Sequence, residues 1–507
     1  MTGRARKAAP LGIALDPATA APLHRQIGEQ IRRGILVRRL APGLKLPSSR
    51  LMAAELHCAR GTILAALDQL IAEGYLVAQP GSGLSVAANL PDEMLVSPNV
   101  GTLHDGPAAR APVLSRRAIG ILANQTLDAE LNESPIAFPT GQPDRTAFPF
   151  PLWAKLLERE WRQPAWSVAG ALHPFGHHGL RTAIADYLGM ARGFSCNPEA
   201  LVITSGVRQS LSLFARLVLD AGEQAWIEEP SFIGTLEALA LAEVNAVAVP
   251  VDASGFSPDA ATALAPNARL AVVAPSHQFP LGVVLGLQRR LALLSWAERA
   301  NGWIAEDDFD GEYRYAGRPL APLRALDRTG RVAYLGSFSK LLFPALRLSY
   351  VVLPDSLVPA AEKSMSAAAV RASMLGQGAL ARFIADGHLA THLRRTRLLY
   401  ANRQQILIAS AARHLGGLLQ VAPDPGGMHL IARPHPDLVP CFDDRAATAA
   451  AAAASLTVSP LSACYRDEPR AQGLILGYAA TPEEAIDPMI MKLGNVLRDR
   501  YAPGLAR

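Results

Sequence analysis

The apolar positions near the start of the chain follow the period of an amphipathic helix. In PLHRQIGEQIRRGIL (22–36) they recur every three or four residues and fall on one face: Leu23, Ile27, Ile31 and Ile35. Polar and charged side chains fill most of the remaining positions. This pattern predicts a helix whose apolar face packs into a small core.

Two more helices and a hairpin are predicted in the next fifty residues. Ser48 or Ser49 can cap a helix over 50–57, because a serine hydroxyl accepts a free N–H of the first turn. A third helix is predicted over 60–73 and ends at a glycine. YLVAQPGSGLSVA (75–87) then predicts two short strands around a Pro-Gly-Ser-Gly turn.

The rest of the chain divides into a segment without periodicity and a long segment of alternating strand and helix patterns. Residues 89–135 are rich in Pro, Gly and Asn and are predicted to be a linker. Residues 136–507 alternate apolar runs with amphipathic stretches, which predicts an α/β domain. The predicted organisation is a basic tail (1–20), a helical domain with a hairpin (21–88), the linker and the α/β domain.

Three helices followed by a hairpin are the layout of a winged helix-turn-helix. In that motif the second helix of the pair enters the DNA major groove and the hairpin contacts the backbone. On topology alone, the alternative is a small helical domain that binds protein. If the domain binds DNA, the residues expected at the interface are Ser49, Arg50, Arg60, Gly61, Thr62, Gly81, Ser82 and Gly83.

The distribution of charge favours DNA. Residues 1–90 contain eleven Lys and Arg and five Asp and Glu, a net charge of +6, whereas the whole chain carries +5. A basic segment joined to a nearly neutral body is typical of a nucleic-acid-binding module attached to another function. The predicted partner is a double-stranded DNA operator.

Composition places the chain among globular proteins of a reducing compartment. Half of its 507 residues are hydrophobic and 18% are charged, as in packed domains. The four cysteines form no Cys-x-x-Cys pair, which argues against a disulfide framework and a zinc site. No apolar run reaches the ~18 residues of a membrane span, and no apolar signal core follows the basic N-terminus. We expect a cytoplasmic protein with no metal and no membrane contact.

Several features of the large domain carry candidate chemistry. LVITSGVRQSLSLFARLVL (201–219) predicts a strand, a Ser-Gly turn and a helix, whose free N–H groups and dipole attract an anion. The candidate phosphate-binding residues are Ser205, Gly206 and Val207. WIAEDDFDGEYRY (303–315) is an apolar strand that ends in acids. It indicates a metal site, a solvated loop or a partner for a protonated ring nitrogen.

SFSKLLFPALRLSY (337–350) places Lys340 in a largely apolar stretch, with Arg347 seven residues later. The simplest interpretation is a surface lysine on a helix. A lysine that attacks a carbonyl needs a lowered pKa, which burial and nearby cations provide. Arg347 would serve as that cation and as a phosphate clamp, with Ser337 and Ser339 completing the anion site.

The large domain combines four features that pyridoxal 5'-phosphate needs: a phosphate site, an acid at a strand end, a lysine and an arginine. The acid keeps the ring an electron sink, the lysine bonds the aldehyde, and the other groups anchor the phosphate. The set also resembles fold-type-I aminotransferases across roughly 136–490. That resemblance assigns Asp307 to the ring nitrogen and Lys340 to the cofactor aldehyde.

Both halves of the chain resemble known families. The N-terminal segment resembles the GntR-type winged helix in three stretches: PLHRQIGEQIRRGIL, LAPGLKLPSSRLMAAEL and LDQLIAEGYLVAQPGSG. The sequence departs from the family pattern at HCARGT. A GntR-type head followed by an aminotransferase-like domain is the layout of the MocR/GabR family of bacterial transcription regulators. The large domain also contains stretches similar to that family's own motifs: PSHQFPLG (275–282), EDDFDGEYRYAGRPL (306–320) and GHLATHLRRTRLLY (387–400).

The resemblance implies a fold and a set of partners. The expected fold is an N-terminal winged helix-turn-helix and a C-terminal α/β domain of the fold-type-I pyridoxal-phosphate-dependent transferases, with α/β/α layers and a small C-terminal subdomain. A homodimer and a small amino-compound effector are expected. The effector would displace Lys340 from the cofactor. The large domain would then shift, and the shift would alter the spacing or orientation of the two DNA-binding domains of the dimer.

Three aromatic positions depart from the aminotransferase pattern in the same way. Phe175, Phe232 and Phe309 stand where that pattern often has tyrosine, so each keeps the ring and lacks the hydroxyl. One interpretation is neutral drift. The other is a cofactor pocket that still packs but bonds less, since a neutral hydrogen bond is worth roughly 0.5–1.5 kcal/mol. All three stay candidate cofactor-binding residues.

The arginines that bind an effector carboxylate in this family are missing. GLILGYAA (473–480) has Ile475 or Leu476 at one such place, and SFIGTLEA (231–238) contains no arginine. Arg208 stands where the family tends to have Gln, and it is a candidate substitute anion contact. The effector is therefore predicted to be less acidic, or to be bound differently.

Three functions stay open. The favoured one is a regulator that uses bound pyridoxal phosphate as a sensor, because the chain has a DNA head and lacks the substrate arginine. The second is an active aminotransferase with an accessory DNA domain. The third is a regulator that has lost the cofactor, which the three phenylalanines allow and which intact Asp307, Lys340 and Arg347 oppose.

Overall fold

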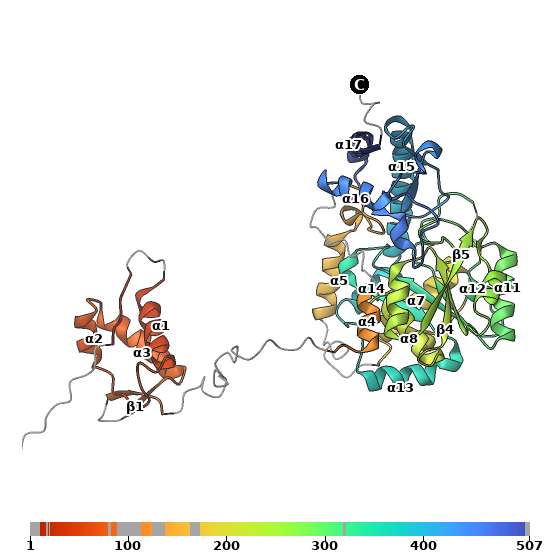
Figure 1. The fold of residues 1–507 in the computed structure, drawn as a ribbon. Coiled ribbons are helices and arrows are strands. Elements are labelled where there is room, and N and C mark those ends of the chain that lie inside the picture. The colour runs from red at the N-terminus through yellow and green to blue at the C-terminus, as the bar shows by residue number, and fades with distance from the viewer. Residues whose placement is uncertain are drawn as a thin grey trace, which may run out of the picture. The chain divides into compact units, whose positions relative to one another are not determined.

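The chain divides into two compact units, residues 1–112 and 113–507 (Figure 1). The computed structural model describes residues 11–16, 19, 21–79, 83–88, 113–123, 137–162, 173–317 and 321–501. None of the helices in these ranges is both long enough and apolar enough to cross a membrane.

Three helices and a hairpin form the N-terminal unit, which confirms the predicted winged helix-turn-helix. Its elements are α1 (Leu23–Leu36), α2 (Ser49–Glu55), α3 (Arg60–Ala72), β1 (Leu76–Gln79) and β2 (Gly83–Val86). The two strands pair antiparallel. Ser48 is the N-cap of α2, because its hydroxyl accepts the Leu51 N–H at 3.3 Å.

The core of this unit follows the predicted face of the first helix, with one exception. Ile27, Ile31 and Ile35 are buried with at most 1% of their surface exposed. Leu23 was predicted on the same face but is 38% exposed. It is the first residue of α1, so no preceding turn of the helix covers it.

The segment 11–16, predicted to be part of a basic tail, is folded onto α1. Its first residue, a leucine, is only 6% exposed. The Gln30 side chain accepts the Ala14 N–H at 3.0 Å and donates to the Ala14 carbonyl at 2.6 Å. Gln26 makes the same pair of hydrogen bonds to Asp16, at 3.0 and 3.1 Å. Two glutamine side chains thus replace the neighbouring strand that an extended backbone needs.

An eight-stranded sheet forms the centre of the second unit, in the order β3-β10-β9-β8-β7-β4-β5-β6. β10 runs antiparallel to both of its neighbours and β6 runs antiparallel to β5, whereas the other pairs are parallel. The carboxyl ends of most strands therefore meet at one edge. The strands are β3 (Leu201–Thr204), β4 (Gln224–Glu229), β5 (Asn245–Asp252), β6 (Gly255–Phe256), β7 (Leu270–Val273), β8 (Trp303–Asp307), β9 (Val332–Ser337) and β10 (Ser349–Val352).

Helices cover both faces of this sheet, which gives the α/β/α layers that were predicted (Figure 1). Alternate residues of the central strands enter the two cores: Ala225 and Ile227 of β4 face one layer, and Trp226 faces the other. One layer contains α8 (Val207–Val218), α9 (Ile233–Leu241) and α13 (Val358–Ala368). The other contains α7 (His178–Arg192), α10 (Pro258–Leu264), α11 (Leu287–Arg299), α12 (Leu323–Leu326) and α14 (Gln377–Ala385).

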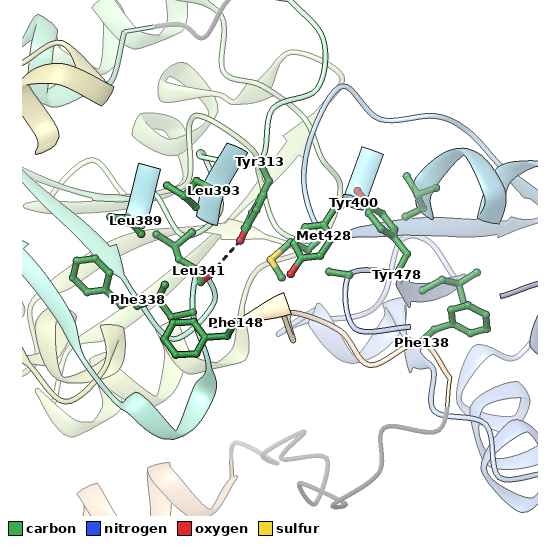
Figure 2. Close-up of a cluster of buried hydrophobic side chains, with 14 of the residues drawn as sticks. Phe138, Phe148, Tyr313, Phe338, Leu341, Leu389, Leu393, Tyr400, Met428 and Tyr478 are labelled. Atoms are coloured by element: carbon green, nitrogen blue, oxygen red, sulfur yellow. Dashed lines mark hydrogen bonds between the residues drawn. The ribbon is translucent and has the colours of Figure 1, made fainter. Parts of the chain in front are cut away.

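The C-terminal part builds the smaller subdomain around an antiparallel sheet of order β11-β12-β14-β13. Its elements are β11 (Leu419–Val421), β12 (His429–Pro434), β13 (Ser459–Pro460), β14 (Leu474–Gly477), α15 (His388–His414), α16 (Asp444–Ala453) and α17 (Glu483–Tyr501). Figure 2 shows the apolar core that this subdomain shares with the segments around 138–148 and 313–341. In that core the Tyr313 hydroxyl donates to the Leu341 carbonyl at 3.4 Å, which anchors the segment after β9.

Helix α4 (Arg116–Ala123) lies inside the range 89–135, which was predicted to be a linker. It packs against α9, and Arg117 forms an ion pair with Glu243. This part of the predicted linker is therefore a helix of the second unit. Its eight residues, RRAIGILA, are too few to reveal a helical period among Pro- and Gly-rich neighbours. Helix α5 (Phe150–Arg162) also precedes the first sheet strand of the second unit.

Candidate functional site

A cavity lies at the carboxyl ends of the parallel strands, where open α/β sheets bind their ligands. The described residues that line it are Val207, Glu228, Ser231, Phe232, Thr235, Val272, Val273, Ala274, Phe279, Asp307, Phe309, Ser337 and Lys340. They come from the ends of β4, β7, β8 and β9 and from the starts of α8 and α9.

Lys340 lies in a tight turn after β9, and not on a helix. Its neighbours Leu341 and Leu342 are buried, so packing fixes the turn. The Nζ atom lies 4.1 Å from the centroid of the Phe309 ring and 5.5 Å from that of Phe232. Lys340 therefore enters the cavity between two aromatic side chains.

The electrostatic surroundings suit Lys340 for nucleophilic chemistry. Burial lowers the pKa of its amine, and the carboxylates of Asp307 and Asp310 act in the opposite direction. An amine with a lowered pKa has a larger neutral, nucleophilic fraction near neutral pH. Gly141 lies beside this amine, since a Cβ there would be in ordinary contact with Cε of Lys340, at 3.6 Å.

Asp307 is the last residue of β8 and lines the same cavity as Lys340. Burial raises the pKa of its carboxyl to about 6, although Lys340 opposes the shift. Its Oδ1 atom is buried and has no hydrogen-bond partner among the described residues. A buried acceptor without a partner is costly, so this oxygen is suited to a donor that a ligand brings.

The start of α8 and Arg347 form a candidate anion site. Gly206 has a φ of 147° and precedes the helix, whose first N–H groups lack partners within it. A Cβ on Gly206 would lie 3.9 Å from a guanidinium nitrogen of Arg347, so the two are close. Val207 lines the cavity, whereas the Ser205 N–H already donates to the Gln209 side chain at 2.6 Å.

The predicted serines after β9 have different positions. Ser337 lines the cavity, and its hydroxyl oxygen accepts the Ser349 hydroxyl at 3.0 Å and the Ser339 N–H at 3.3 Å. Ser339 is half-buried and is not part of the described lining. Its backbone N–H holds the Ser337 hydroxyl in place.

Phe175, a predicted cofactor contact, does not lie at the cavity. Its carbonyl accepts the Ile203 N–H at 2.9 Å, so its backbone lies along the edge of β3. Its ring is fully buried in the core under α8. Phe232 and Phe309, the other two phenylalanines in question, both line the cavity.

Glu228 and Phe279 are lining residues that the sequence interpretation missed. Glu228 is next to last in the run QAWIEE, as Glu306 is in WIAED, so acids near the end of an apolar strand could have pointed to it. It is 6% exposed, and its Oε2 accepts the Ala274 N–H at 3.2 Å. Burial raises the pKa of its carboxyl to about 8.

The candidate DNA-binding residues of the N-terminal unit gather where α2 meets the start of α3. Arg60 is exposed, and its Nε donates to the Ser49 hydroxyl at 3.2 Å. Arg50 and Gly61 are exposed and Thr62 is half-buried. Gly83 is exposed, has a φ of 87° and opens β2. Gly81 and Ser82 lie outside the described residues.

Both units match known families. Residues 23–86 match the bacterial regulatory proteins of the gntR family, and residues 136–486 match aminotransferase class I and II. The chain is 39% identical over 490 residues to the probable rhizopine catabolism regulatory protein MocR of Rhizobium meliloti, covering 96% of each chain. It is 32% identical over 501 residues to the pyridoxine biosynthesis transcriptional regulator PdxR of Corynebacterium glutamicum, covering 96% of this chain and 99% of the relative.

Solved structures agree with the fold of the second unit. LysN, an α-aminoadipate aminotransferase from Thermus thermophilus, has a TM-score of 0.68 at 24% identity and covers 76% of this chain and 97% of its own. Kynurenine aminotransferase of Pyrococcus horikoshii has a TM-score of 0.67 at 24% identity, with the same coverage.

A gntR-type head in front of an aminotransferase-like body defines a class of two-part transcription regulators. The chain belongs within this class to the MocR/GabR-type family of bacterial transcription regulators.

Proposed function

We propose that this regulator binds pyridoxal 5'-phosphate in the cavity and uses it to sense a small amino compound. The observation that carries the proposal is the presence of Lys340 and Asp307 in one cavity. One supplies an amine whose pKa burial lowers, and the other supplies a buried oxygen without a partner.

The other residues of the cavity also suit this cofactor. The free oxygen of Asp307 suits a protonated ring nitrogen, and the start of α8 with Arg347 suits a phosphate. Phe232 and the apolar side chains of β7 suit the faces of a flat ring. When bound, the cofactor supplies an aldehyde that reacts with amines, next to an electron-withdrawing ring.

In this proposal each residue has a defined part. Asp307 holds the proton on the ring nitrogen, Arg347 and Gly206 hold the phosphate, and Lys340 holds the aldehyde end. An amino compound that enters the cavity competes with Lys340. The contacts inside the cavity then change. This change shifts the equilibrium of the dimer between two arrangements of its DNA-binding domains.

The proposal includes a homodimer that binds a double-stranded operator in the cytoplasm. Winged-helix heads commonly bind as symmetric pairs to two half-sites, so a two-fold dimer fits a palindromic operator. The exposed Arg50 at the start of α2 and the exposed Arg60 at the start of α3 support contacts to DNA. The operator can be found by selection of random duplexes on the full-length protein.

The first experiment is a visible absorption spectrum of the purified full-length protein, before and after borohydride. We expect a band that borohydride abolishes and that the Lys340→Ala variant lacks. Lys363→Ala, a change of an exposed lysine on α13, is the matched control and should keep the band. A protein that stays colourless with added pyridoxal phosphate would contradict the proposal.

An active aminotransferase is the second candidate, because the same pair of residues serves both functions. β14 weighs against it: Ile475 and Leu476, one of which stands at the place of a substrate-binding arginine, are at most 1% exposed and apolar. An assay for keto-acid formation from amino acids should give no turnover above free pyridoxal phosphate. Sustained turnover would favour the enzyme.

A further inference from the structure

The cavity proposed to hold the cofactor carries more acid than base. Of the described residues that line it, Glu228 and Asp307 are acidic and Lys340 is basic. Glu228 is next to last in β4 and Asp307 is last in β8, with only β7 between these strands. Burial raises the pKa of Glu228 to about 8, and the charge of Asp307 adds to the shift. The cavity thus already disfavours a negative charge on Glu228, and a ligand carboxylate would bring in another negative charge with no cation to offset it.

Arg208, the candidate anion contact from the sequence, already pairs with an acid. Its Nε lies 2.9 Å from Oε2 of Glu237, a buried residue of α9, and its guanidinium carbon lies 5.6 Å from the centroid of the Phe232 ring. A Cβ on Gly234 would lie 2.6 Å from this Nε, so Arg208 fills the space that a side chain there would need. Glu237 thus already offsets the charge of this guanidinium, so a ligand carboxylate would gain less from Arg208 than from an arginine without an acidic partner.

Other positions do not supply the missing cation. Arg347 lies beside Gly206, at the end of the cavity proposed for the phosphate. Ile475 and Leu476 on β14 are apolar and buried. Among the described residues, therefore, the lining offers a carboxylate no guanidinium.

The rest of the lining suits uncharged groups. The residues that contribute hydroxyls or aromatic rings are Ser231, Thr235, Ser337, Phe232, Phe279 and Phe309. Hydroxyls bond to neutral polar groups, and ring faces attract apolar groups and cations. On the basis of the proposed function, we propose that the effector is an amine whose other groups are uncharged, and that it carries no carboxylate.

The test compares ligands that differ only by a carboxylate, on the full-length protein loaded with pyridoxal phosphate. The pairs are 2-phenylethylamine and phenylalanine, 3-methylbutylamine and leucine, and ethanolamine and serine. Each compound is titrated against the visible band of the bound cofactor. We expect each amine to shift the band at a concentration about tenfold or more below that of its amino acid, because burying a carboxylate in a desolvated site without a guanidinium partner is strongly disfavoured. Amino acids as effective as their amines, or no shift with any amine, would overturn the proposal.

Glu228→Gln tests the source of the selectivity, because it removes one carboxyl at nearly constant size. Measured at pH 9, above the pKa of about 8 that burial gives Glu228, the preference for amine over amino acid should fall by about threefold or more, since a like charge is removed. Glu229→Gln is the matched control on the same strand. Its carboxylate accepts the N–H groups of Arg466 and Asp467 at 2.8 and 3.0 Å, outside the lining, so the preference should stay.

An unchanged preference in Glu228→Gln, or an equal loss in both variants, would overturn the role of the cavity acids in selecting the ligand. Failure of the proposed function looks different. In that case the Lys340-dependent band is absent before any ligand is added.

Discussion

The amine of Lys340 lies over the face of the Phe309 ring, with Nζ 4.1 Å from the ring centroid. A cation over an aromatic face is stabilised, so the ring favours the charged amine, whereas burial lowers the pKa of that amine. The ring is thus in direct contact with the group proposed to bond the cofactor. Phe309 is the position where a hydroxyl was expected and is missing.

Phe309→Tyr should tighten cofactor binding. The added hydroxyl would lie in the cavity, and a neutral hydrogen bond is worth roughly 0.5–1.5 kcal/mol, or about two- to tenfold in the dissociation constant. The measurement is a titration of the apo protein with pyridoxal phosphate, followed by absorbance. Phe150→Tyr on α5, at a ring that is 46% exposed, is the control and should bind as the parent does. Weaker binding by Phe309→Tyr would show that the pocket has no room for the oxygen.

Glu228 should make the apo protein less stable as the pH rises. Burial raises the pKa of its carboxyl to about 8, whereas an unfolded glutamate titrates near about 4.3. The folded chain therefore binds a proton that the unfolded chain has released, and stability falls between about pH 4 and pH 8. One proton accounts for at most about 1.4 kcal/mol per pH unit.

Glu228→Gln should remove this dependence, so its melting temperature should exceed that of the parent increasingly from pH 5 to pH 8. Tryptophan fluorescence is a suitable probe, because all six tryptophans lie in the second unit. Glu298→Gln, an exposed acid of α11, should melt in parallel with the parent. Parallel curves for Glu228→Gln would contradict the assigned cause.

His277 should contribute stability that is lost at high pH. Its Nδ1 lies 3.0 Å from Oδ2 of Asp310 and its Nε2 lies 3.3 Å from Oδ1 of Asp424. Burial alone would lower the pKa of this imidazole, but the two carboxylates raise it to about 10. Because the folded pKa exceeds the unfolded value of about 6.5, the contribution is complete below that pH and disappears as the pH rises through about 10.

His277→Gln should therefore destabilise the second unit by about 3–5 kcal/mol near pH 6, because it leaves two carboxylates without their cation. The difference from the parent should shrink toward pH 10. Thermal unfolding at several pH values measures it, with His178→Gln, whose side chain is 70% exposed, as the control. A constant difference across this range would mean that the imidazole is not charged.

Arg60→Ala should weaken DNA binding and leave the cofactor spectrum unchanged. Arg60 opens α3 and is exposed, so its loss removes a positive charge from the interface. If it contacts a phosphate, the salt dependence of binding should fall by about one unit of slope. Binding to a selected duplex at several salt concentrations gives both numbers. Lys363→Ala, an equal loss of charge on the second unit, should change neither.

The spacing of apolar residues in the sequence predicted the helices and hairpin of the N-terminal unit. It also predicted the strands whose ends line the cavity. It placed Ile27, Ile31 and Ile35 correctly in the core, and it placed Asp307 at a strand end. The fold of the second unit followed from strand and helix alternation together with the family resemblance. Local patterns suffice here because the strands are short, apolar and bounded by turns.

Features that depend on packing between distant segments could not be predicted. Phe175 looked like a ligand contact, but its backbone pairs with Ile203 and turns the ring into the core. Glu228, next to the last residue of an apolar strand, was missed, because its place at the cavity follows from the neighbouring strands and not from its own segment. The ion pair of Arg208 with Glu237 joins two helices and has no signal in either one.

The hydrogen bonds from Gln26 and Gln30 to residues 11–16 define where the DNA-binding module begins. The family match starts at residue 23, twelve positions after the buried leucine that opens this segment. A head cut at the match would lose apolar residues that complete its core, together with the backbone that the two glutamines bind. Transplanting this head onto another sensor, or studying it in isolation, therefore requires a fragment that starts before residue 11.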